Sequence, residues 1–132
     1  QASCATPGFF PPVSLHGMLL VDGGVAEIVP VFLAKTFRPD FIIGVDVSRE
    51  IEPISEQGQI HHSLDVVFRS YELTRDFINV YTSRELDVVI RPQIGSSDWS
   101  DFKFFDHYVE EGYKAAKARM ADIRKKIFWV DW

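Results

Sequence analysis

The sequence has little cysteine and no long apolar run, and both absences narrow the class of protein. Cys4 is the only cysteine in the 132 residues, so no disulfide can form within the chain. This fits a reducing compartment, and we expect a cytoplasmic protein. No apolar run approaches the roughly 20 residues that a membrane-spanning helix needs, and no signal-peptide pattern is present. The formal net charge of −5 argues against a general nucleic-acid-binding protein.

Several common catalytic signatures are also absent. The sequence contains no glycine-rich phosphate loop, no Walker pattern, no H-E-x-x-H zinc motif and no G-x-S-x-G nucleophile elbow. His61 and His62 are adjacent, so they would point to different faces of a helix and could not easily share a metal ion. His107 and Glu111 are four residues apart on a predicted helix, but two ligands do not make a zinc site. We therefore expect neither a metal nor a cofactor.

A short apolar run followed by an acid and two glycines organises the rest of the chain. Residues 18–21 are all apolar, and Asp22, Gly23 and Gly24 follow directly. Such a run, bounded by turn residues, predicts a buried strand. The glycines can adopt positive φ and permit close approach of other backbone, so we expect a sharp turn after the acid. Asp22 would then lie at the carboxyl end of a core strand, where open α/β sheets place their chemistry, although Asp-Gly is also a common turn signal.

Alternating strand and helix patterns predict an α/β fold. Residues 13–15 and 18–21 flank a two-residue turn and predict a hairpin. A short helix should begin near Pro30, because proline suits the first turn of a helix. The apolar run over residues 41–47 has the pattern of a strand covered on both faces. Strand, helix and strand over about thirty residues make a βαβ unit with a right-handed crossover, so we expect a mainly parallel sheet.

The second half of the chain continues the alternation. Apolar positions at three- and four-residue steps predict amphipathic helices over residues 60–81 and 106–127. Between them, residues 86–90 predict another buried strand. Asp22 and Asp46 would both lie near the carboxyl ends of strands. A metal- or phosphate-dependent α/β domain with these two carboxylates paired is therefore one open alternative.

Two sequence blocks, in order, carry a resemblance to a known family. Residues 2–12 (ASCATPGFFPP) resemble the A-S-x-x-x-P-x-x-F-x-P block of patatin-like phospholipases. Residues 20–25 (LVDGGV) are similar to the L-V-D-G-G/A-V motif of the same family. The likeness extends over nearly the whole chain, and further blocks resemble the bacterial branch of the family: Pro30-Val31 and residues 45–48, 87–92 and 111–116.

The resemblance implies a three-layer patatin-like α/β fold and a serine lipid acyl hydrolase that uses a Ser-Asp dyad without histidine. Asp22 occupies the position of the dyad acid, and Gly23 and Gly24 form the active-site turn. A carboxylate with a pKa of about 3.9 is a weak base, so it must be held within hydrogen-bond reach of the serine and partly desolvated. In the family, a G-x-S-x-G motif supplies the serine and a glycine-rich loop supplies the oxyanion hole. Neither occurs in this sequence.

This departure leads to several expectations. Residues 1–132 should form the C-terminal segment of a patatin-like catalytic domain, without the part that bears the nucleophile, and should be inactive alone. Such a segment should expose sheet edge and apolar surface. The expected partners are a lipid or ester substrate, the N-terminal part of the same domain and, peripherally, a membrane. The alternative is a non-catalytic lipid- or membrane-surface-binding module, in which the basic last helix and the Trp-rich residues 128–132 contact the membrane.

Overall fold

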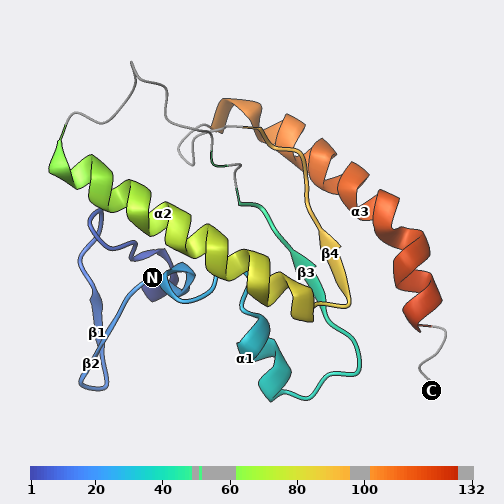
Figure 1. Ribbon diagram of the computed structural model, residues 1–132, viewed down its shortest axis with the longest axis horizontal. Coiled ribbons are helices and arrows are strands. Elements are labelled where there is room, and N and C mark those ends of the chain that lie inside the picture. Colours follow the sequence, from blue (N-terminus) through green and yellow to red (C-terminus); the bar gives the residue numbers. More distant parts are fainter. Residues whose placement is uncertain (49–50, 52–61, 96–101, 128–132) are drawn as a thin grey trace.

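The computed structural model describes residues 1–48, 51, 62–95 and 102–127. Two long helices lie on either side of a small parallel sheet, and a hairpin and a short helix lie toward the N-terminal end (Figure 1). The predicted α/β fold class is confirmed. None of the helices in this described part is long and apolar enough to cross a membrane. The elements are β1 (Val13–Leu15), β2 (Met18–Leu20), α1 (Val31–Thr36), β3 (Ile43–Val45), α2 (Ser63–Thr82), β4 (Val88–Ile90) and α3 (Phe105–Ile127), with 3-10 turns at Ala2–Cys4, Gly23–Val25, Ser83–Glu85 and Phe102–Phe104.

All three predicted helices are confirmed. Helix α1 begins directly after Pro30, and α3 covers the predicted range to within one residue. Helix α2 begins at Ser63. Just before it, the backbone N–H of His62 donates a hydrogen bond to the carboxylate of Asp65 at 2.8 Å. This bond satisfies one of the amides that a helix N-terminus leaves without an intrahelical partner. The predicted start at residue 60 lies outside the described residues.

The predicted hairpin is confirmed, but the predicted burial of its second strand is wrong. Strands β1 and β2 pair antiparallel, and His16 and Gly17 both adopt positive φ in the turn between them. Leu19, in the centre of β2, is 72% exposed. The tight turn gives β2 its hydrogen-bond partners locally, and β2 pairs with no other strand of the described chain. The apolar run over residues 18–21 therefore did not indicate whether another element would cover this strand.

The parallel pair is β3 with β4, so the βαβ unit differs from the predicted one. Ile43 pairs with Val88 and Val45 with Ile90, and α2 is the crossover between the two strands. The unit predicted over residues 18–47 is wrong, because β2 belongs to the hairpin and not to this sheet. The prediction of a parallel sheet is confirmed for β3 and β4.

The described core lies between β4 and α3, and it leaves one face of β3 uncovered. Val88, Ile90 and Ile123 form the buried cluster. In the register of the sheet, Ile43 and Val45 share the face of Val88 and Ile90, yet they are 42% and 53% exposed. The prediction that this strand is covered on both faces is wrong, because α3 packs on β4. The predicted exposure of apolar surface is confirmed.

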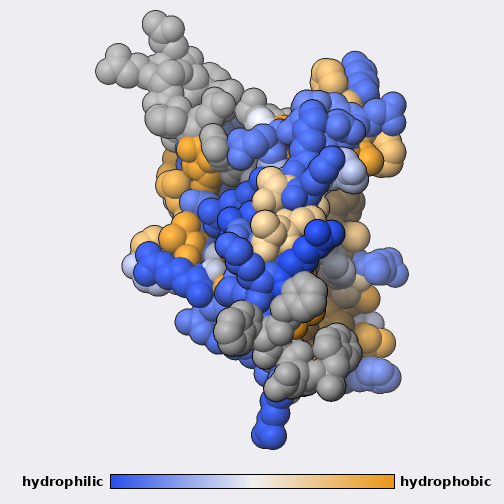
Figure 2. Space-filling view, turned by 90° about the vertical axis from the view of Figure 1, so that its right-hand side faces the viewer, coloured by the Kyte–Doolittle hydropathy of each residue, from blue (hydrophilic) through white to orange (hydrophobic). Residues whose placement is uncertain are grey.

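The surface over α3 is mainly hydrophilic, broken by small apolar areas (Figure 2). The last turn of α3 is basic, with Arg124, Lys125 and Lys126, and these cations interact favourably with the negative end of the helix dipole. Lys126 donates to the backbone carbonyl of Asp87 at 2.8 Å, which ties α3 to the start of β4. The predicted membrane contact of residues 128–132 lies outside the described residues.

Gly44 is a position where an added methyl group should destabilise the fold. A Cβ on Gly44 would lie 3.0 Å from Leu86 Cδ2, and closer still to Leu86 Cδ1. We expect Gly44→Ala to lower the free energy of unfolding by about 1–3 kcal/mol, because the sheet is overpacked at that point. Urea unfolding measures the loss, and Leu86→Ala in the same chain should reduce the penalty of the added methyl. Gly112→Ala is the control for a methyl group without steric conflict, since a Cβ there meets nothing within 4 Å; because Gly112 lies within α3, this change should raise the free energy of unfolding by about 1 kcal/mol. A neutral Gly44→Ala would contradict this packing.

Candidate functional site

Asp22 is held at the end of the hairpin as the N-cap of a short 3-10 turn. Its Oδ1 accepts a hydrogen bond from the backbone N–H of Gly24 at 2.7 Å. Its own N–H donates to the carbonyl oxygen of Ala5 at 3.0 Å. Ala5 is buried and Asp22 is half-buried. The acid is therefore fixed through both its backbone and its side chain, and it is not fully exposed to water.

The second carboxylate oxygen of Asp22 has a different partner. The hydroxyl of Thr6 donates to Asp22 Oδ2 at 3.2 Å. Thr6 is half-buried and lies 16 residues earlier in the chain, in the N-terminal loop. The loop and the turn after β2 thus hold one oxygen each, and the plane of the carboxylate is fixed.

The two glycines of the turn have different roles. The predicted sharp turn after Asp22 is confirmed as the 3-10 turn Gly23–Val25, and neither glycine needs positive φ to form it. The neighbours of Gly24 are side chains and not the predicted backbone: a Cβ there would lie 2.8 Å from Arg75 Nη2 and 3.1 Å from Asp22 Oδ1. A Cβ on Gly23 would meet nothing within 4 Å. The guanidinium of Arg75 is therefore a close neighbour of the Asp22 carboxylate.

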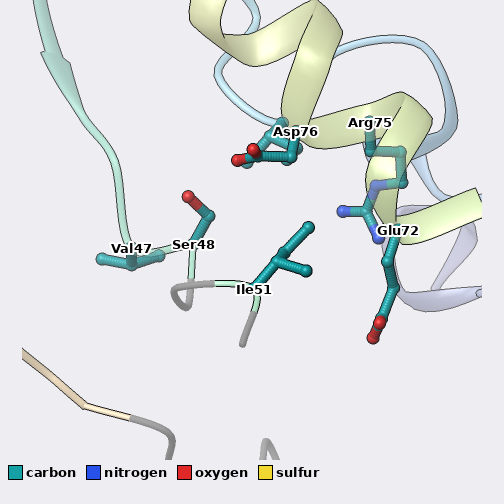
Figure 3. A pocket seen from close by; sticks show the side chains of 7 residues that line it. Val47, Ser48, Ile51, Glu72, Arg75 and Asp76 are labelled. Carbon is teal, nitrogen blue, oxygen red and sulfur yellow. The ribbon is translucent and has the colours of Figure 1, made fainter. Parts of the chain in front are cut away.

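Arg75 connects the Asp22 turn to a cavity of about 260 Å³. Figure 3 shows Glu72, Arg75 and Asp76 on α2 opposite Val47, Ser48 and Ile51; Ile28 completes the lining. The Arg75 guanidinium stacks over Tyr71, 5.0 Å from its ring centroid. Its Nε is buried and has no hydrogen-bond partner among the described residues. The cavity combines aliphatic walls with charged groups, so it can hold a molecule that has both apolar and polar parts.

Asp46 is buried, with 4% of its surface exposed, and hydrogen-bond donors surround its carboxylate. Oδ1 accepts from the amide of Ser48 at 3.0 Å and from its hydroxyl at 2.6 Å. Oδ2 accepts from Asn79 Nδ2 at 2.9 Å and from Arg91 Nε at 3.0 Å. Burial raises the pKa of Asp46, but the hydrogen bonds from Ser48, Asn79 and Arg91 outweigh it, so the pKa is lowered. Asp46 ties the end of β3 to α2 and to the residue after β4.

A second cavity, of about 470 Å³, lies beside this cluster at the carboxyl ends of β3 and β4. It shares Ser48, Ile51 and Asp76 with the cavity beside Arg75, and Arg91 also lines it. Polar residues of the two strand ends therefore border one hollowed region of the surface. This is where open α/β sheets bind their ligands.

In the described part of the chain the candidate metal ligands form no group of three or more, although His107 lies near Glu111. Asp22 and Asp46 share no hydrogen-bond partner. Glu111 forms an ion pair with Lys114 at 2.9 Å. In residues 1–48, 51, 62–95 and 102–127, no group of three or more His, Cys, Asp or Glu side chains could hold a metal ion. The pair His61 and His62 cannot be described, because His61 lies outside these ranges.

The fold and site define an α/β protein with a carboxylate fixed after a short strand, close to a cavity. Comparisons with known proteins narrow this class. A family model described as patatin-like phospholipase matches residues 1–35, which include Asp22, Gly23 and Gly24. The predicted resemblance to the patatin-like phospholipase family is therefore confirmed.

The curated relatives that the chain matches are longer proteins. An uncharacterised NTE family protein of Mycobacterium tuberculosis is 24% identical over 91% of this chain and 24% of its own length. A protein named lysophospholipase NTE1 from Meyerozyma guilliermondii is 23% identical over 86% of this chain and 9% of its own length. The protein of the same name from Scheffersomyces stipitis is 23% identical over 88% of this chain and 9% of its own length. The chain thus spans a quarter or less of these relatives.

Proposed function

We propose that these residues supply the acid of a Ser-Asp dyad in a serine lipid acyl hydrolase, and that Asp22 is this acid. The observation that carries the proposal is the way Asp22 is held: each carboxylate oxygen accepts one hydrogen bond, and the group is half-buried. A weak base needs such fixed geometry and partial desolvation to accept a proton from a hydroxyl. The match of the patatin-like family model to residues 1–35 supports the same assignment.

The proposed reaction uses Asp22 as a general base and then as a general acid. Asp22 takes the proton of a serine hydroxyl while the serine oxygen attacks the ester carbonyl carbon. The tetrahedral intermediate expels the alcohol, which leaves with the proton held by Asp22, and an acyl-serine remains. Water then attacks the acyl-serine, Asp22 accepts a proton from this water, and the serine regains it as the fatty acid leaves. Oxyanion donors would stabilise each tetrahedral intermediate.

The nucleophile and the oxyanion loop belong, in this proposal, to polypeptide outside residues 1–132, because no G-x-S-x-G occurs in the sequence. Residues 1–132 would be the C-terminal segment of the catalytic domain. The exposed apolar face of β3, with Ile43 and Val45, supports this, since sheets with a covered face are the rule in α/β folds. A lipid or ester is the proposed substrate, and peripheral contact with a lipid surface is proposed with it.

The first test is the activity of the 132-residue chain alone. We expect no enzyme-like hydrolysis of p-nitrophenyl esters, because Asp22 has no activated serine to serve in this sequence. The natural protein expressed from its whole gene is the control, and it should hydrolyse the same esters. If the chain alone hydrolysed them at enzyme-like rates, and Asp22→Asn made no difference, the assignment of Asp22 would be wrong.

A further inference from the structure

A carboxylate with a single hydrogen bond is poorly oriented, because rotation about the terminal bond of an aspartate side chain has a broad energy profile. In Asp22, the bond from the Gly24 amide to Oδ1 fixes one oxygen. The bond from the Thr6 hydroxyl to Oδ2 then fixes the plane of the group. Removing the Thr6 hydroxyl would leave Oδ2 free to turn away from a nucleophile.

The Thr6 hydroxyl is itself held in place by a well-anchored loop. The carbonyl of Thr6 accepts hydrogen bonds from the amides of Phe9 and Phe10 at 3.1 and 3.0 Å. Phe9 packs against Phe68 of α2, with ring centroids 5.2 Å apart. Gly8, at φ +89°, lies so close to Phe68 that a Cβ there would be 2.8 Å from its ring. The loop thus presents the hydroxyl from a fixed position between the hairpin and α2.

The Thr6 bond leaves Oδ2 able to accept a second hydrogen bond. Oδ2 accepts only from Thr6 among the described residues, at 3.2 Å, and a carboxylate oxygen has two lone pairs. Oδ1, by contrast, faces the short 2.7 Å bond from Gly24 and has Arg75 beside it. Oδ2 is therefore the oxygen best placed to receive a serine proton, and Thr6 sets its direction.

We propose that Thr6 is a positioning residue for the hydrolase reaction, whose hydroxyl orients Asp22 Oδ2 toward the nucleophile. This inference rests on the proposed function of Asp22. Thr6 falls on an unspecified position of the A-S-x-x-x-P-x-x-F-x-P block, so the family pattern assigns it no role. Thr6 acts through Asp22 and does not itself touch the reacting ester.

The test uses the natural protein and three threonine variants. Thr6→Val keeps the shape and removes the hydroxyl; we expect kcat to fall about tenfold with KM changed by less than about twofold, as for the loss of a hydrogen bond to a charged group. Thr6→Ser keeps a hydroxyl and should restore most of the kcat. Thr74→Val is the matched control, because the Thr74 hydroxyl bonds the Ser70 carbonyl on an exposed part of α2. Its activity should be that of the wild type.

Three outcomes decide the matter. In an Asp22→Asn background, Thr6→Val should have no further effect, because Thr6 acts only through the carboxylate. If Thr6→Val keeps full kcat, or if Thr6→Ser loses as much as Thr6→Val, the positioning role is overturned while the role of Asp22 stands. If Asp22→Asn itself leaves hydrolysis unchanged, the proposed function fails first. Thr6→Ala, read together with its melting temperature, provides the same comparison should Thr6→Val not fold.

Discussion

Asp22→Asn is expected to lower kcat for ester hydrolysis by the natural protein at least ~10³-fold, the scale on which removal of a catalytic general base acts. Asparagine has the shape of aspartate but cannot accept the serine proton. Its side-chain oxygen can still accept from the Gly24 amide, and its NH₂ group can donate to the Thr6 hydroxyl. Because asparagine is as good an N-cap as aspartate, the free energy of unfolding should change by less than about 1 kcal/mol.

The pair of measurements separates a catalytic acid from a turn residue. Hydrolysis of a p-nitrophenyl ester gives kcat, and urea unfolding gives the stability of the same preparation. Asp40→Asn is the matched control, since Asp40 is exposed, and both quantities should stay at wild-type values. If Asp22→Asn lost activity only because the protein was destabilised, Asp22 would merely hold the turn. If Asp22→Asn kept full activity, the proposal that Asp22 is the dyad acid would be wrong.

The hairpin, the three helices and the position of β4 could be predicted because their signals are local. A two-residue turn, a proline before a helix and apolar residues at three- and four-residue steps each act within one element. What failed was the pairing of elements. Residues 18–21 and 41–47 are similar apolar runs, yet one forms half of an exposed hairpin and the other pairs with a strand more than forty residues away.

The candidate site could likewise be predicted only where its residues are neighbours in the sequence. The acid and the glycines are adjacent in the sequence, so the position of Asp22 and the sharp turn after it could be predicted from the sequence. Thr6 and Arg75 could not, because the loop before the hairpin and helix α2 bring them to Asp22 only in the folded chain. Because Asp46 follows a predicted strand, the sequence also suggested it as a second carboxylate of a functional site, paired with Asp22. In the structure, both oxygens of the Asp46 carboxylate accept two hydrogen bonds from neighbouring residues, so this group stabilises the fold.

Asp46→Ala should therefore cause a large loss of stability. The substitution leaves the buried amide of Asn79 without its acceptor and removes the partner of Arg91. We expect the free energy of unfolding to fall by about 1–3 kcal/mol, the cost of leaving a buried polar group such as the Asn79 amide without its partner, since water can solvate the exposed part of Arg91. Arg91→Ala should cost less, because the Arg91 side chain is 54% exposed and its loss leaves three donors on the carboxylate. Urea unfolding measures both variants, with Asp40→Ala as the exposed control.

The same carboxylate should make the fold sensitive to acid. Because its hydrogen bonds lower the pKa of Asp46 below the ordinary 3.8, the unfolded chain binds this proton more readily than the folded chain does. The stabilising contribution is thus complete above pH 3.8, decreases as the pH falls below that value, and is lost below the lowered pKa of the folded state. The difference in unfolding free energy between wild type and Asp46→Asn, measured by urea unfolding at a series of pH values, should shrink over this window. A difference that stayed constant down to the lowest pH, or grew there, would mean that Asp46 does not hold the strand ends together through its ionised form.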